Sequence, residues 1–202
     1  MTNIGRSAFE NCKSLSSITI PDGVTSIGSY TFSNCRSLSS ITLSKNLTSI
    51  GYHAFNGCAA LSSITLPESL TAIGDHAFVS CSFSSIFSKA IIPPKIEDGS
   101  AFQGINETIP VYVPKESVDA YKTAIGWTNF TNFLGLETST QQVEQFKGLK
   151  ISNGKLYNAD GLFIEIFNVN GQPVYKGRDV TVCLSSGIYI IRCKSSCFNI
   201  KL

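Results

Sequence analysis

The sequence has little of what enzyme active sites are usually built from. Its 202 residues include two histidines, one methionine and one tryptophan, and only 15% of them are charged. General acid–base and nucleophilic catalysis need ionisable or nucleophilic side chains in an organised cluster. The sequence contains no nucleophile elbow, phosphate-binding loop, His-Glu-x-x-His sequence or carboxylate pair in a motif context. We therefore predict a protein that is not an enzyme, has no catalytic residues and uses no cofactor.

Long apolar runs and an excess of basic charge are also missing. The longest apolar stretches are of the kind found at 188–191, so we predict no membrane span. The net charge of +2 is too small for the basic stripe that a nucleic-acid partner requires. Met1 is followed within a few residues by the first repeat described below, which leaves no room for a signal peptide. We expect a trimmed start or a chain that is not exported by that route.

What the sequence does contain is a repeat with a period of 23 residues. Ile-Gly pairs at 4–5, 27–28, 50–51 and 73–74 recur in step with Phe9, Phe32, Phe55 and Phe78 and with Cys12, Cys35, Cys58 and Cys81. Each of the first three units ends in an Ile-Thr-Ile/Leu triplet, whose alternation predicts a short strand with Ile inward and Thr outward. Stacked units give a parallel sheet backed by the Phe and Cys columns, with Gly5 and its equivalents at tight turns.

This unit, Ile-Gly-x-x-Ala-Phe-x-x-Cys-x-x-Leu-x-x-Ile-x-Ile-Pro, resembles the BspA-like leucine-rich repeats over roughly residues 2 to 137. The resemblance implies a right-handed α/β leucine-rich-repeat solenoid with no catalytic columns. It also implies an extracellular or bacterial cell-surface protein of the Bacteroides type, associated with adhesion and with binding of host proteins.

The two ends of the array differ. After Ile86 the pattern loosens into a strand over 109–113 and a helix that Pro114 opens and Gly126 closes. We expect Val118, Tyr121 and Ile125 on one side of this helix, and the aromatic residues at 127, 130 and 133 to complete a C-terminal cap. No cap precedes Ile4, so we expect a fragment of a longer array whose open end could pair with a second copy.

A polar segment over 137–144 separates this domain, residues 1–137, from a second one, residues 138–202. Strands are predicted at 149–152, 162–169, 180–184, 188–193 and 197–202, which indicates a small antiparallel β-sandwich. The sequences at 166–175 and 184–190 resemble the C-terminal β-domain of the type IX secretion sorting family. That resemblance implies an export or attachment module, while the same short motifs also fit a generic sandwich.

Seven cysteines raise the question of metal ions and disulfides. The four that recur every 23 residues predict a ladder of small buried thiols, because zinc ligands come in pairs at closer spacing. Cys193 and Cys197 flank a three-residue turn and are expected to face each other across a hairpin, as a disulfide or as paired thiols. Cys183 is the third cysteine of the second domain.

Two surfaces are candidates for binding. The outward Ser/Thr face, with Phe87 as a stacking platform, is predicted to bind a host protein or a glycan, although β-propensity also explains it; its residues are Ser17, Thr19, Ser40, Thr42, Ser63, Thr65 and Phe87. His53 and His76 share one repeat column with Tyr30, and with Asp75 nearby they form a weak candidate for a metal site against the commoner solvated histidine. The alternative to a binding protein is an assembly module that self-associates.

Overall fold

The structure is a computed structural model that describes residues 2–137, 149–152, 155–158, 163–168, 172–178, 181–183, 188–193 and 196–201. The chain divides into two compact units, Met1–Phe133 and Leu134–Leu202. Each unit is described by itself. The predicted boundary between residues 137 and 138 stays a prediction.

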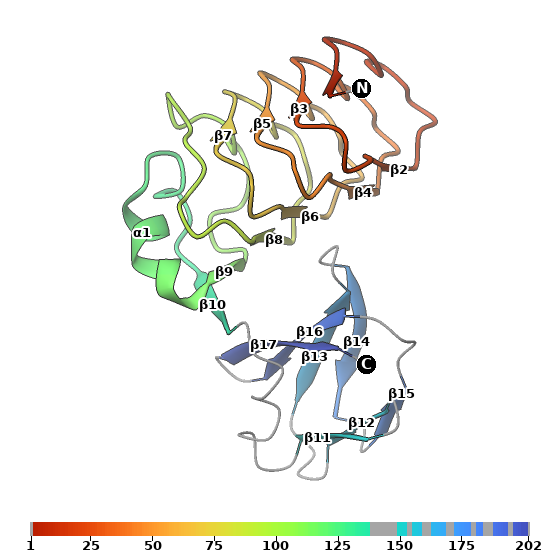
Figure 1. Ribbon diagram of the computed structural model, residues 1–202, viewed down its shortest axis with the longest axis vertical. Helices are drawn as coiled ribbons and strands as arrows, with labels where there is room; N and C mark the ends of the chain where they lie inside the picture. Colours follow the sequence, from red (N-terminus) through yellow and green to blue (C-terminus); the bar gives the residue numbers. More distant parts are fainter. Residues whose placement is uncertain are drawn as a thin grey trace. The chain divides into compact units, whose positions relative to one another are not determined.

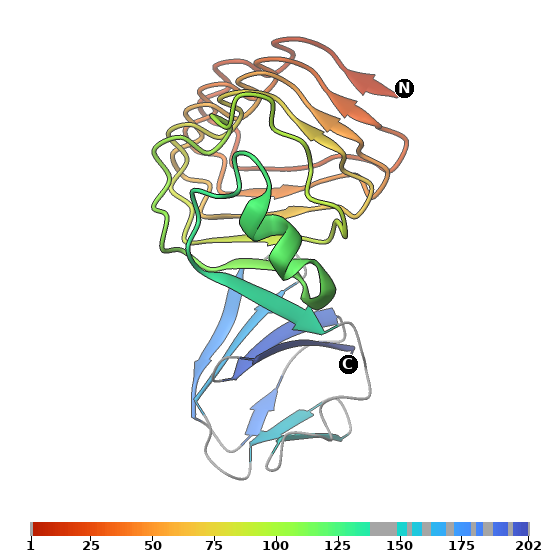
Figure 2. The ribbon, with the colours of Figure 1, turned by 90° about the vertical axis from the view of Figure 1, so that its left-hand side faces the viewer.

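The first unit is a parallel-strand solenoid, as the repeat predicted (Figures 1 and 2). One side carries a ladder of two-residue strands, in which each Ile of an Ile-Gly pair aligns with the next, as in Ile4↔Ile27. These strands are β1 (Asn3–Ile4), β3 (Ser26–Ile27), β5 (Ser49–Ile50) and β7 (Ala72–Ile73), and a bridge between Ala72 and Lys95 extends the ladder by one more turn. A strand of two residues is too short to show an alternating pattern, so the sequence did not predict these strands.

A second ladder holds the predicted Ile-Thr strands. Figure 1 shows β2, β4, β6 and β8 side by side, and the strand registers align Ile18 with Ile41 and Ile64 with Ile86. The strands are β2 (Ser17–Thr19), β4 (Ser40–Thr42), β6 (Ser63–Leu66), β8 (Ser85–Ser88) and β9 (Val111–Pro114). Since every unit has the same length up to Cys81, each residue stacks on its counterpart one repeat later.

Phenylalanine rings fill the space between the two ladders. Phe9, Phe32, Phe55, Phe78 and Phe102 form a continuous stack with centroid separations of 5.2–5.4 Å. The predicted thiol ladder runs beside it: Cys35, Cys58 and Cys81 are buried, and each thiol donates to the carbonyl oxygen of a phenylalanine in the preceding repeat. Cys12, in the first turn, is exposed.

The glycines of the Ile-Gly pairs allow successive turns to pack closely. A Cβ at Gly51 would lie 2.6 Å from the Ser29 backbone nitrogen and 2.7 Å from the carbonyl carbon of Gly28. The left-handed backbone occurs two residues further on, at Ser7, Tyr30, His53 and His76, with φ of 52–59°. Glycine is therefore required for contact between repeats, and not for the turn conformation that we predicted.

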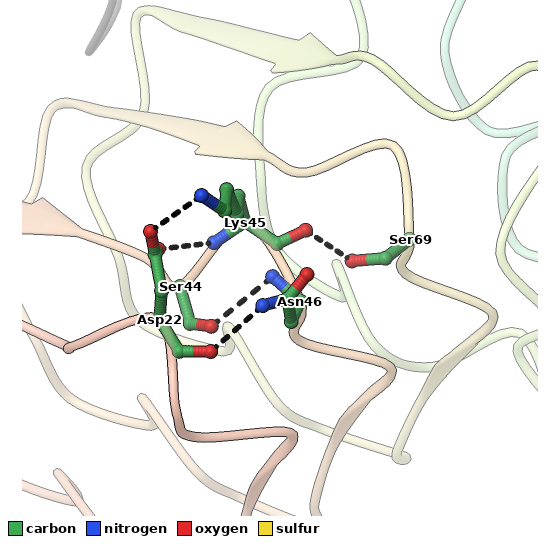
Figure 3. Close-up of polar contacts among 5 residues, drawn as sticks. All are labelled: Asp22, Ser44, Lys45, Asn46 and Ser69. Carbon is green, nitrogen blue, oxygen red and sulfur yellow. Dashed lines mark hydrogen bonds and ion pairs between the residues drawn. The ribbon is translucent and has the colours of Figure 1, made fainter.

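Polar contacts join the loops that follow the second ladder (Figure 3). The Lys45 ammonium lies 3.0 Å from the Asp22 carboxylate, and the Asn46 amide donates to the Asp22 carbonyl oxygen at 2.8 Å. Ser69 then donates to the Lys45 carbonyl oxygen at 2.7 Å. Hydrogen bonds from Lys45 lower the pKa of Asp22 below its ordinary value. Because these groups are exposed, their contacts help to align successive repeats but contribute little to the free energy of folding.

The predicted cap forms at the end of the array. Pro114 precedes the 3-10 helix η1 (Lys115–Ser117), which continues into α1 (Val118–Thr123), and Tyr121 and Trp127 are fully buried. The Trp127 indole donates to the carbonyl oxygen of Pro94 at 3.0 Å. The prediction for Ile125 was wrong: it is 67% exposed, because the helix ends before it and the chain becomes extended at Ala124.

The second unit is built from short strands. Its antiparallel pairs join β11 (Leu149–Ser152) with β12 (Lys155–Asn158), β12 with β15 (Thr181–Cys183), β13 (Ile164–Asn168) with β14 (Pro173–Gly177), β13 with β16 (Ile188–Cys193), and β16 with β17 (Ser196–Lys201). One parallel pair joins β17 to β10 (Phe133–Glu137). The sequence analysis did not predict β12 and β14.

The register of the last hairpin corrects the prediction for its cysteines. Cys193 aligns with Ser196, and Cys197 aligns with Arg192. The two cysteines are therefore not directly opposite each other, because the loop is one residue shorter than predicted. Among the described residues, no helix is long and apolar enough to cross a membrane.

Candidate binding surface

The predicted Ser/Thr face is unevenly exposed. Ser17 and Thr19 on β2 are exposed, and Ser40, Thr42 and Thr65 are half-buried. Ser63 is 6% exposed and Phe87 is 1% exposed. The Phe87 ring stacks on Tyr112 with a centroid separation of 4.4 Å. The hydroxyl groups that the structure presents to solvent therefore come mainly from β2 and β4.

The column that holds both histidines is a regular row of half-buried rings. Tyr30, His53 and His76, here called the ring column, stack nearly parallel, with centroid separations of 5.2 and 5.1 Å and interplanar angles of 7°. All three rings sit on left-handed backbone. This conformation is costly for bulky residues and persists where surrounding contacts impose it, which is common at functional sites.

Two further side chains border the ring column. The Arg6 guanidinium lies 5.2 Å from the Tyr30 centroid, within the range of a cation–π contact. Tyr52 packs edge-on against His53 at 4.0 Å and lies 6.0 Å from His76. With 42% of its surface exposed, Tyr52 offers an aromatic ring to a ligand.

A polar cluster lies at the C-terminal end of the ring column. The Ser100 hydroxyl is 3.0 Å from His76 Nδ1, and the Ser100 amide donates to the Asp98 carboxylate at 2.8 Å. The Asp98 amide in turn faces the Asp75 carboxylate at 3.4 Å. The sequence placed Asp75 beside the histidines, and its carbonyl oxygen does accept from the His53 amide, but its carboxylate contacts Asp98 in the next turn.

The pKa values in this cluster follow from the contacts. Hydrogen bonds from Ser100 lower the pKa of Asp98, whereas burial, then hydrogen bonding with Asp98, raises the pKa of Asp75. Burial and the neighbouring His76 lower the pKa of His53, so its neutral form is favoured. Burial also raises the pKa of Tyr52, with contributions from Tyr30 and from the Asp75 and Asp98 charges.

A cavity of about 460 Å³ opens beside this cluster, in the range typical of small-ligand sites, and is here called the end cavity. Its buried floor is apolar and comes from Phe102, Ile105 and Phe130. Its polar lining comes from His76, Asp98, Ser100, Gln103, Glu107 and Asn129. Such a mixture can hold a polar ligand by hydrogen bonds over an apolar surface.

The same residues are a poor set for a metal ion. Among the described residues, no three His, Cys, Asp or Glu side chains come together as ligands. His53 and His76 are stacked face to face, an arrangement that does not aim their nitrogen atoms at a common point. The weak metal candidate thus has no geometric support.

Sequence reasoning found the histidines but missed most of the end cavity. Gln103, Glu107 and Asn129 follow the point where the 23-residue pattern loosens, and Asn129 belongs to the cap. Tyr52 precedes His53 but stands outside the matched columns. No periodic signal identifies these residues; only the folding of the last turn against the cap brings them together.

The geometry defines a leucine-rich-repeat solenoid: stacked parallel strands, an inner phenylalanine ladder and a helical cap. Comparison with protein families gives the same class, because residues 1–107 match the BspA type leucine rich repeat region in six copies. The chain belongs to this BspA-type leucine-rich-repeat family.

Two solved structures are similar to this chain. A leucine-rich repeat protein from Bacteroides capillosus ATCC 29799 is 38% identical, with a TM-score of 0.41 over 44% of this chain and 64% of its own. A leucine rich cell surface protein from Faecalibacterium prausnitzii A2-165 is 22% identical, with a TM-score of 0.34 over 78% of this chain and 46% of its own. This chain thus spans less than two thirds of either protein. Comparison with curated proteins gives no match.

Proposed function

We propose that this chain is a non-enzymatic binding and adhesion protein, secreted or held at a bacterial cell surface, that recognises a host protein or a glycan through its solenoid. The observation that carries the proposal is the stacked, half-buried rings of the ring column beside the exposed Tyr52, a row that ends at an open polar cavity. Backbone hydrogen bonds join Tyr30 to Tyr52 and His53 to Asp75 in the next turn, so the recognition surface is preorganised and little ordering entropy opposes binding. Family membership supports the same class of function.

The test is binding of the whole chain to immobilised host matrix proteins and to a glycan array at physiological salt. We expect saturable binding to at least one of them. Two variants compare the surfaces: Thr19→Lys with Thr42→Lys blocks the Ser/Thr face, and Tyr52→Ala removes the exposed ring. Loss of binding in the first variant would assign recognition to the Ser/Thr face, and loss in the second would assign it to the aromatic row. No binding to any member of either panel would contradict the proposal.

For residues 138–202 we propose a small antiparallel β-sandwich that serves in sorting or attachment. The antiparallel pairs β13–β14, β13–β16 and β16–β17 support the sheet, and the family resemblance at 166–175 supports the role. The test compares the chain with a version lacking 138–202, both given the same signal peptide, in a bacterium with type IX secretion. Surface exposure that depends on 138–202 is expected. Equal exposure of both versions would contradict a sorting role.

The second candidate is assembly through the first turn of the array. Phe9 and Leu15 are half-buried there, whereas their counterparts Phe32 and Leu38 are fully buried. A second copy packed on this turn would bury the part of Phe9 and Leu15 that is still exposed. We expect concentration-dependent dimers in sedimentation equilibrium if assembly is the function, and Phe9→Glu should return them to monomers. A monomer across a wide concentration range would reject this alternative.

A further inference from the structure

We propose that the end cavity is a binding site for a neutral, hydroxyl-rich saccharide whose chain continues over the ring of Tyr52. This inference rests on the proposed binding function and names its ligand class and its site. Three features support it: the residues that line the cavity, the hydrogen bonds that these residues make, and the position of the exposed Tyr52 ring.

The lining has the side chains that sugars require. Planar carboxylates and amides can each engage two neighbouring hydroxyl groups, and Glu107, Gln103 and Asn129 supply one carboxylate and two amides at the rim. In the part of the chain that the structure describes, these three side chains make no intramolecular hydrogen bond. Their donors and acceptors are therefore available to a ligand without breaking an existing contact.

The second polar wall is preorganised. The Ser100 hydroxyl is held between His76 Nδ1 and the Asp98 carboxylate, and Asp98 also accepts from the Ser100 amide. These bonds fix the rotamers of the wall, so a ligand loses little entropy in meeting it. Phe102 and Phe130, which are 3% and 4% exposed, close the floor of the cavity with apolar side chains.

The charged side chains that line the cavity limit the class of ligand. Asp98 and Glu107 line the cavity, and no lysine or arginine is among the described residues that do so. Anionic sugars would therefore be repelled, and a phosphate or sulfate group would find no cationic partner. A cationic group would be attracted by the same charges, but it would offer no acceptor to the amide N–H donors of Gln103 and Asn129. The neutral saccharide is the ligand that uses every part of the site.

Tyr52 extends the site beyond one sugar ring. Its centroid lies 6.0 Å from the His76 ring, and His76 lines the cavity, so the exposed tyrosine is one side chain away from the cavity lining. Aromatic rings offer a flat face to the C–H side of a sugar. A ligand of two or more sugar units would thus contact both the polar cavity and the ring.

The experiment is saturation-transfer NMR on the whole chain with neutral di- and trisaccharides, with their sialylated and sulfated forms, and with a lysine-rich peptide. We expect transfer to at least one neutral saccharide and weaker transfer to its charged forms. Glu107→Gln, Gln103→Ala and Tyr52→Ala should each weaken binding about threefold to tenfold, the effect of one lost hydrogen bond or ring contact. Glu68→Gln, on an exposed loop away from the cavity, is the matched control.

The outcomes separate this inference from the proposed function. Preference for the lysine-rich peptide, or saccharide binding that survives all three cavity variants, would overturn the inference while the binding function stands. Absence of binding to every saccharide here and to every protein in the panel would overturn both. Thermal unfolding of each variant shows whether a loss of binding is a loss of fold; rim residues are exposed, so we expect unchanged melting temperatures.

Discussion

At the scale of single residues, the repeat is maintained by what each position can fit between two neighbouring turns. Small residues face the adjoining backbone, rings face rings, and thiols face carbonyl oxygens. The cost of a substitution therefore depends on the space available at that turn. Equivalent positions in different repeats give matched comparisons, because their local sequence is nearly the same.

Gly51 and Gly5 form such a pair. A Cβ at Gly51 would lie 2.6 Å from backbone atoms of the previous turn, whereas a Cβ at Gly5 meets nothing within 4 Å. We expect Gly51→Ala to lower the free energy of unfolding by about 1–3 kcal/mol, as overpacking does. Gly5→Ala should change it by less than about 0.5 kcal/mol. Urea unfolding of both variants measures the difference, and equal effects would contradict the packing role.

Cys58 links stability to alkaline pH. Burial raises the pKa of its thiol from 9.0 to about 12, so the folded state binds the proton more tightly than the unfolded state. The resulting stability is complete below pH 9, and it is lost as the pH rises from there toward the folded-state value. The Cys58→Ala variant has no thiol to ionise at this position, so it does not lose this stability at alkaline pH. We therefore expect the gap in unfolding free energy between wild type and variant to narrow from pH 8 to pH 11. A gap that stays constant would show that the thiol is not protected.

At the scale of elements, the cap closes the array through buried polar contacts as well as apolar ones. Tyr121 donates from its hydroxyl to the Ala90 carbonyl oxygen at 2.9 Å, and the Ser88 hydroxyl lies 2.7 Å away. The Tyr121 ring packs on Trp127. These contacts tie α1 to the end of β8 and to the segment after it, so the helix depends on the array for its stability.

Removing the Tyr121 hydroxyl tests that dependence. Tyr121→Phe keeps the ring but leaves the buried Ser88 hydroxyl and Ala90 carbonyl without their partner. We expect a loss of about 1–3 kcal/mol in the free energy of unfolding, the cost of unsatisfied buried groups. Tyr52→Phe, at a 42% exposed position, is the control and should change stability by less than about 0.5 kcal/mol. Similar losses in the two variants would contradict this account of the cap.

The sequence predicted correctly the elements that recur at a constant spacing of 23 residues. The strands around Ile41 and Ile64 and the buried columns of Phe55 and Cys58 follow from 23-residue spacing. The two-residue strands such as Ser49–Ile50 were missed because they are too short to alternate. Ile125 was misplaced because a helical pattern does not reveal that α1 stops at Thr123.

The candidate site was predicted only in part for a related reason. His53 and His76 stand out by sharing a column, but the hydrogen-bonding residues around them come from other segments. Gln103 and Asn129 are 26 positions apart and meet at one cavity only because the cap folds back on the last turn. Tertiary proximity of this kind leaves no periodic trace in one sequence. The Ser/Thr face remains a prediction, with exposed hydroxyl groups chiefly on β2 and β4.

At the scale of the whole molecule, the solenoid is a one-dimensional stack in which each turn is stabilised by its neighbours. Interior turns have two neighbours. Among the residues that the structure describes, the first turn has one, and its ring Phe9 is half-buried while Phe55 is fully buried. Local opening should therefore begin at the first turn.

Hydrogen exchange measures this gradient. The Phe9 amide donates to Thr31, and the Phe55 amide donates to Ala77, both at 2.8 Å. Although the two bonds are alike in length, we expect the Phe9 amide to exchange at least about tenfold faster, which corresponds to about 1.4 kcal/mol in opening free energy. Equal protection would mean that the solenoid opens as one unit.

Recognition by the solenoid can be tested by hydrogen exchange of the whole chain, with and without the best-binding member of the protein and glycan panels. We expect slowed exchange within residues 1–133, concentrated around Tyr52, His76 and Ser100. Protection confined to residues 134–202, or no partner in either panel, would contradict it.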